Sequence, residues 1–155
     1  MFINSNGLRL LGMSGFLLLS LSFISSAQAQ ICTALNVIGA NGTSVKKTVS
    51  PFSTLVTNNN WNTDFAVPSE QSFSQFVATI VPENIANYDL ELNLKYSDES
   101  SDTSYKKENV GVTFAHPLNL VGRSRPNSNP YQVNVFIGGL NAIGNTYTVS
   151  VEGCS

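Results

Sequence analysis

The chain is poor in the residues on which most metal sites and hydrolytic enzymes depend. Its 155 residues include one histidine, His116, and two cysteines, Cys32 and Cys154. A structural zinc site uses four ligands of these kinds, so the composition argues against zinc. The GxSxG motif of serine hydrolases and the HExxH motif of zinc peptidases are both missing. A catalytic triad would have to use His116, which we interpret as a surface or structural residue.

Charge is also scarce, because only 12% of the residues are Asp, Glu, Lys or Arg. Eight basic and ten acidic residues give a net charge of −2. This mildly acidic balance argues against binding to nucleic acid or to anionic membrane surfaces.

Long hydrophobic runs are absent except at the N-terminus. Arg9 precedes an apolar run over residues 10–24, and an Ala-x-Ala pattern follows it. The run is shorter than the ~20 residues that span a bilayer. We therefore predict a cleaved signal peptide over residues 1–29 and one secreted domain over residues 30–155, extracellular or periplasmic and without a membrane anchor. A retained N-terminal anchor is the alternative.

The two cysteines lie at opposite ends of this predicted domain. In an oxidising compartment, a pair placed in this way indicates one disulfide bond, Cys32–Cys154, that ties the termini together. Lipid attachment to Cys32 is disfavoured because the preceding residue, Ile31, is not small.

The clearest structural signal is the segment YDLELNLKY over residues 88–96. Its apolar and polar residues alternate strictly, which is typical of a strand with one buried face and one exposed face. The apolar set is Tyr88, Leu90, Leu92, Leu94 and Tyr96.

Weaker alternation and turn residues divide the rest of the chain into further short strands. The segments at 131–137 and 147–151 are predicted to form a hairpin, and residues 69–81 fit a helix or, preferably, a strand over 73–81. The polar segments 97–109 and 119–130 are predicted to be surface loops. These features predict an all-β fold, an antiparallel β-sandwich of jelly-roll or immunoglobulin-like type. The other expected strands are 32–38, 45–50, 52–57, 65–67 and 110–115.

Carboxylates form the first candidate site. Asp89 and Glu91 lie on the polar face of the 88–96 strand, and Asp98 and Asp102 follow in the next segment. Several oxygen ligands close together are what calcium requires, so calcium is a possible cofactor here. The EF-hand pattern is absent, and the alternative is solvated surface charge. A carboxylate pair for glycoside hydrolysis is a further alternative.

Aromatic residues in polar segments form the second candidate site. Trp61 and Tyr105 are surrounded by polar residues, where a flat ring can stack on a sugar or on a partner protein. The alternative for Trp61 is burial at one end of the sandwich, since large aromatics are usually mostly buried. Arg123 and Arg125 are interpreted as solvated, or as a fork onto a carboxylate.

The order of motifs resembles the bacterial pre-peptidase C-terminal domain over about residues 73–153. The D-L-x-L core of residues 89–92 matches its first strand. The Y-x-V-x-V segment at 131–135 and the Y-T-V-x-V segment at 147–151 match its later strands. The resemblance implies a jelly-roll-like sandwich that acts as a non-catalytic accessory module of secreted hydrolases.

The sequence therefore favours a secreted, non-catalytic β-sandwich module with an extracellular binding or structural role. Its partners would be an extracellular polysaccharide or a surface protein. The alternatives are a carbohydrate-binding module that uses Trp61 and Tyr105, a small hydrolase that uses His116 or the Asp89 and Glu91 carboxylates, and a polymerising subunit that is completed by a neighbour's strand.

Overall fold

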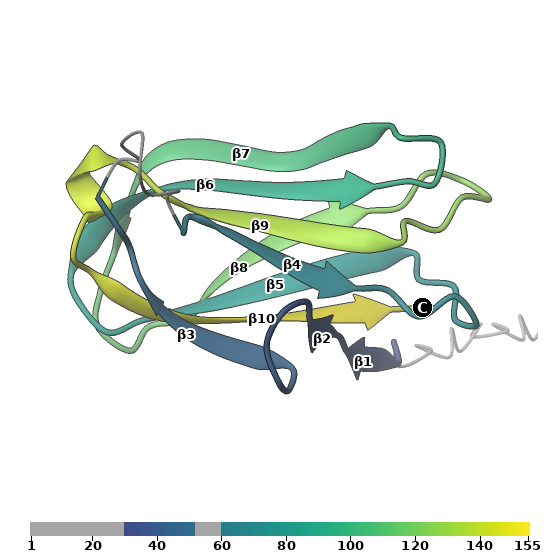
Figure 1. The fold of residues 1–155 in the computed structure, drawn as a ribbon, viewed down its shortest axis with the longest axis horizontal. Helices are drawn as coiled ribbons and strands as arrows, with labels where there is room; N and C mark the ends of the chain where they lie inside the picture. Colours follow the sequence, from purple (N-terminus) through teal and green to yellow (C-terminus); the bar gives the residue numbers. More distant parts are fainter. Residues whose placement is uncertain (1–29, 52–59) are drawn as a thin grey trace, which may run out of the picture.

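A computed structural model of the chain describes residues 30–51 and 60–155, which fold into two stacked antiparallel β-sheets (Figure 1). The predicted signal peptide and the expected strand over 52–57 lie outside the described residues. Among the described residues, no helix is both long enough and apolar enough to span a bilayer.

The first sheet has β10 and β5 at its centre, and β8 pairs with the free edge of β5. On the other side, β1 and β3 pair with successive parts of one edge of β10. The five strands of the first sheet are β1 (Cys32–Ala34), β3 (Ser44–Thr48), β5 (Gln75–Pro82), β8 (Leu118–Arg123) and β10 (Thr146–Cys154).

The second sheet follows the order β2-β4-β9-β6-β7. A short 3-10 turn, η1 (Leu140–Ala142), lies between β9 and β10, where the chain crosses from the second sheet to the first. The five strands of the second sheet are β2 (Asn36–Val37), β4 (Asn62–Ala66), β6 (Ala86–Lys95), β7 (Ser101–Val112) and β9 (Gln132–Gly138).

The predicted β-sandwich is confirmed, and its core is the one that alternation indicates. The five apolar residues of the 88–96 segment are 0–2% exposed, and the same alternation buries one face of β5. The strand interpretation of residues 73–81 is therefore confirmed over its helical alternative. Across the layers, the rings of Tyr88 on β6 and Tyr147 on β10 meet edge to face with centroids 5.9 Å apart.

The predicted disulfide is also confirmed. Cys32 on β1 and Cys154 on β10 are direct cross-strand partners, and their sulfur atoms are 2.07 Å apart. The bond therefore joins the first strand to the last strand within the first sheet.

Two predictions about chain connections were wrong. The segments at 131–137 and 147–151 are strands β9 and β10, but they belong to different sheets and do not form a hairpin. Alternation shows which face of a strand is buried, and two strands that bury their faces against each other show the same pattern as two strands side by side. The expected first strand over 32–38 is likewise divided between the two sheets, as β1 and β2.

Both predicted loops contain a strand: most of residues 97–109 belongs to one, and so does the first part of residues 119–130. Residues 101–112 form β7, which pairs with β6, and residues 118–123 form β8, which pairs with β5. β7 is an edge strand with most of its residues exposed or half-buried, so hydrophobic alternation does not mark it. Its backbone pairing with β6 holds it in the sheet, and its charged residues are typical of a protected sheet edge.

Lys47 on β3 points inward, because its partner in the register is the buried residue Tyr147. The ammonium group donates hydrogen bonds to the carbonyl oxygen of Asn62 at 2.7 Å and to Thr63 Oγ1 at 3.1 Å. Burial lowers the pKa of this amine, while Asp64 acts in the opposite direction. One lysine thus links β3 of the first sheet to β4 of the second.

Candidate functional site

Trp61, expected as a stacking platform, is 6% exposed and lies just before β4. Its indole N–H donates a hydrogen bond to the Ser50 carbonyl oxygen at 2.9 Å. Its ring covers Gly138, where an added Cβ would lie only 2.4 Å from the indole. The platform interpretation of Trp61 is therefore wrong, because both packing and hydrogen bonding keep the ring covered, as the alternative of burial expects.

Tyr105 lies on β7 and not in a loop. Its register partner is Leu92, so its ring is directed toward the interior and packs against the core. The Lys107 ammonium lies 5.6 Å from the ring centroid. Trp61 packs beside Phe136, which is on the solvent face of the same sheet, so the structure does not bring Trp61 and Tyr105 together as one aromatic site.

Asp89 and Glu91 lie on the outer face of β6, as predicted. Asp89 Oδ1 accepts a hydrogen bond from the Asn109 backbone N–H at 2.8 Å. Glu91 forms an ion pair with Lys106 of β7 at 2.6 Å. Both carboxylates are therefore already engaged by groups of β7.

Asp98 lies in the connection after β6, and Asp102 lies at the start of β7, where it is the register partner of Leu94; both face Arg125. The guanidinium group binds Asp102 through two hydrogen bonds of 2.7 and 2.6 Å and stacks on the Tyr96 ring, 4.1 Å from its centroid. The hydrogen bond from Arg125 holds the pKa of Asp102 below its usual value, and bonds from Ser100 do the same for Asp98. Arg125 thus forms the fork onto a carboxylate that was one of its two expected roles.

The four carboxylates considered for calcium are therefore divided between two places and are not brought together. In the described part of the chain, no group of three or more His, Cys, Asp or Glu side chains is arranged to hold a metal ion. His116 is exposed in the connection between β7 and β8, and Arg123 is exposed at the end of β8. The hydrolase alternative needs a pocket around His116 or the β6 carboxylates, and neither His116 nor these carboxylates line the hollow formed by residues 72–74, 124–129 and Ser155.

The outer face of the second sheet carries a row of linked polar side chains, which we call the polar row: Asp64 on β4, Asn134 on β9, Asn93 on β6 and Thr103 on β7. The four are successive partners in the strand register. Asn134 Nδ2 donates to Asp64 Oδ1 at 2.8 Å, and Asn93 Nδ2 donates to Asn134 Oδ1 at 3.4 Å. Thr103 Oγ1 donates to Asn93 Oδ1 at 2.7 Å. The row therefore crosses four strands as one hydrogen-bonded chain.

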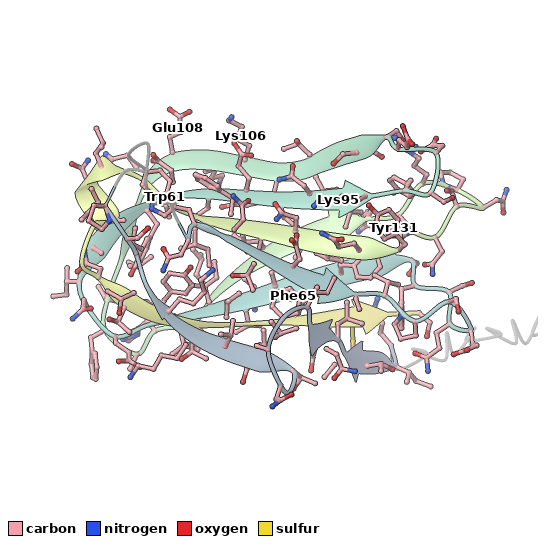
Figure 2. The ribbon with its side chains drawn as sticks, viewed as in Figure 1. Trp61, Phe65, Lys95, Lys106, Glu108 and Tyr131 are labelled. Atoms are coloured by element: carbon pink, nitrogen blue, oxygen red, sulfur yellow. A yellow bond between two sulfur atoms is a disulfide. The ribbon has the colours of Figure 1, made fainter. Side chains whose placement is uncertain are left out.

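Phe136 lies on the same outer face, two residues along β9 from Asn134. It is half-buried, and Trp61 supports it edge to face with ring centroids 5.7 Å apart. Its partners in the register are Asn62 and Glu91. On the other side of the polar row, Lys95 forms an ion pair with Asp64 at 3.4 Å. Lys95 and Trp61 lie toward opposite ends of this sheet (Figure 2).

With Phe136 beside the polar row, the outer face of the second sheet can make two kinds of contact with a ligand. The ring offers a flat apolar surface, and the amide and carboxylate oxygens and N–H groups offer hydrogen bonds in fixed directions. Sequence reasoning missed Phe136 and the polar row. The available signal was the placement of Phe136 at a polar position of the 131–137 alternation, next to Gln132 and Asn134.

No family model matches the chain, and no curated protein sequence is similar to it. Among solved structures, one described as "CBM4 structure and function" is similar to this chain with a TM-score of 0.37 and 7% sequence identity. The match covers 81% of this chain and 92% of that chain. The function is therefore inferred from this chain's own residues.

Proposed function

We propose that this protein is a secreted, non-catalytic module that binds an extracellular carbohydrate on the outer face of the second sheet. The observation that carries the proposal is the half-buried ring of Phe136 on a solvent-facing side, next to the polar row. One part of the ring packs on Trp61 and the core, and the part that stays exposed is a candidate for contact with a ligand. The accessory role implied by the resemblance to the pre-peptidase C-terminal domain belongs to the same proposal.

The chemistry of the polar row suits sugar hydroxyl groups. Each hydroxyl can donate one hydrogen bond and accept others, and an amide or carboxylate side chain supplies the matching partners within one plane. Asn134 fixes both Asp64 and Asn93, so these two side chains are held in place before a ligand arrives. Preorganisation of this kind reduces the entropy that binding costs. Phe136 would contact the apolar C–H face of a sugar ring.

The charges on this face favour a neutral ligand. Lys95 pairs with Asp64, and Lys106 pairs with Glu91, so positive and negative groups alternate across the strands. Such an arrangement creates no extended field of one sign that would attract a polyanion. A neutral polysaccharide therefore fits better than nucleic acid.

The predicted signal peptide and the Cys32–Cys154 bond support export to an oxidising compartment, where carbohydrate ligands occur. The absence of catalysis is proposed because the groups that hydrolysis would use are separated. His116 is in the β7–β8 connection, whereas Asp89 and Glu91 lie on β6 and are held by β7.

Retention on insoluble neutral polysaccharides, such as cellulose, chitin and mannan, tests the proposal. We expect the mature protein to be retained by at least one of them and Phe136→Ala to bind about tenfold more weakly, which corresponds to about 1.4 kcal/mol. The matched control is Phe114→Ala, because Phe114 is 65% exposed and lies outside this face, in the β7–β8 connection. Equal retention of the two variants, or no retention of the wild type on any polysaccharide, would contradict the proposal.

A further inference from the structure

A hollow of about 740 Å³ lies at the end of the sandwich where the segment before β5 meets the β8–β9 connection. Its lining includes residues 72–74, residues 124–129 and Ser155. Five of these ten residues are serines and two are asparagines, and they surround the side chains of Phe73 and Pro126. The volume is within the range of small-molecule sites, roughly 300–1,000 Å³.

The walls of the hollow are fixed by hydrogen bonds within the protein. The Ser124 backbone N–H donates to the Ser74 carbonyl oxygen at 3.1 Å, and its hydroxyl donates to the Phe73 carbonyl oxygen at 2.7 Å. Asn129 accepts a bond from the Phe73 N–H at 3.3 Å and donates to the Gln71 carbonyl oxygen at 2.8 Å. These hydrogen bonds hold the segment before β5 and the β8–β9 connection together without a ligand.

The rim carries polar groups that the protein itself does not use. Pro126 and Asn127 occupy the centre of a turn that the Ser128 N–H closes onto the Arg125 carbonyl oxygen at 3.2 Å, with Asn127 at φ 57°. Among the described residues, the side chains of Ser72, Asn127 and Ser128 make no hydrogen bond, and all three line the hollow. Two hydroxyls and one amide therefore project from a hydrogen-bonded backbone and are available to a ligand.

The one charged side chain in the lining of the hollow, Arg125, is already paired. Its guanidinium group is bound by Asp102 and lies 3.6 Å from Asp98. No side chain of the lining therefore offers a free countercharge to an ionic ligand. The Phe73 ring is 6% exposed and packs on Phe76, so Pro126 is the exposed apolar ring of the lining. Hydroxyls, an amide and this ring match a neutral ligand that has both hydroxyl groups and a C–H face.

From this geometry we infer that the hollow is a second binding site, specific for a short neutral saccharide or the end of a neutral glycan chain. It shares no residue with the polar row or with Phe136, so it does not depend on the proposed function of that face. The free hydroxyls of Ser72 and Ser128 and the amide of Asn127 bind the sugar hydroxyls. The exposed ring of Pro126 contacts its apolar side.

Backbone amide NMR spectra of the mature protein, titrated with glucose, galactose, mannose, N-acetylglucosamine, cellobiose and maltose, test the inference. We expect at least one sugar to shift the amide signals of residues 72–74 and 124–129 in a saturable way. Ser128→Trp fills the hollow and should weaken this binding at least tenfold. Ser44→Trp, a matched change on the exposed face of β3, should leave it unchanged.

Two further variants separate this site from the face of the second sheet. Phe136→Ala should lose retention on polysaccharide but keep the sugar-dependent shifts in the hollow, and Ser128→Trp should do the reverse. The inference is overturned if none of the six sugars shifts these amides at tens of millimolar. It is also overturned if Phe136→Ala abolishes the shifts, or if Ser44→Trp weakens binding as much as Ser128→Trp.

Discussion

The two outer faces of the sandwich differ in chemistry although both sheets bury the same kind of apolar residues. The outer face of the second sheet has the polar row, two ion pairs and Phe136. The outer face of the first sheet has separate pairs instead: Val77 beside Val121, and hydrogen bonds from Thr79 to Asn119 and between Thr48 and Thr146. Each of these contacts joins two strands, whereas the polar row is linked across four strands and therefore restricts more side-chain rotamers together.

The first sheet carries the covalent link of the molecule, so the largest effect on stability is expected there. Reduction of Cys32–Cys154, or a Cys32→Ser and Cys154→Ser double variant, should destabilise the fold by on the order of 4–5 kcal/mol in the chain-entropy model. The melting temperature should fall by about 10 °C or more, as measured by calorimetry.

Ligand retention at temperatures where the reduced protein is still folded should not change, because the bond lies in the sheet opposite to the proposed face. Equal melting of the oxidised and reduced forms would contradict the role of the bond as a link between the termini.

Loss of the Asn134 side chain should show the difference between the two outer faces most clearly. Its side chain is 6% exposed, and its loss leaves Asp64 and Asn93 without their shared partner. Asn134→Ala should cost about 1–3 kcal/mol of unfolding free energy and reduce polysaccharide retention.

The matched control is Thr79→Ala on the first sheet, where the side chain makes one exposed bond to Asn119. Its effect should stay within about 0.5 kcal/mol in urea unfolding. If the two variants lose similar unfolding free energy, the hydrogen bonds of the polar row contribute no more to stability than those of the opposite face.

The smallest expected effect concerns pH and the Arg125–Asp102 pair, which joins the β8–β9 connection to β7. Because the pKa of Asp102 is lowered in the folded state, the pair stabilises the fold above the ordinary aspartate pKa of about 3.9 and is lost as the pH falls through the lowered value. Melting temperatures of the wild type should therefore decline below about pH 4, and Asp102→Asn should show a shallower decline. Parallel curves for the two proteins would show that the pair does not contribute.

The sequence predicted what depends on burial. The alternation in residues 88–96 identified a buried strand, because a local pattern is enough to show which side chains are buried. The disulfide was identified because each cysteine has only one other cysteine with which it can pair. Most of the strand at 101–112 and the strand at 118–123 were missed, although the strand expected at 110–115 includes the end of β7. β7 is held by backbone pairing and charged edge residues, which leave no apolar pattern. The hairpin error has a related cause, since periodicity does not show to which sheet a strand belongs.

The candidate site was harder to predict because it exists only across strands. Asp64, Asn93, Thr103 and Asn134 are far apart in the sequence and become neighbours through the register of four strands. Trp61 was conspicuous in the sequence because of its polar surroundings, yet Gly138 leaves a place on the sheet surface that its indole fills. Phe136 was visible as an apolar residue at a polar position, and the reason for its placement required the sheet.

The inward-pointing lysine of β3 also bears on assembly. In the described residues, the outer edge of β3 is not paired with another strand, and such edges are templates on which further chains add. An inward-pointing charged residue is one of the devices that protect such an edge. Lys47 provides one here, because its ammonium group is anchored to Asn62 and Thr63 on the inner side of β3. It therefore makes the edge of β3 a poorer template for a further chain.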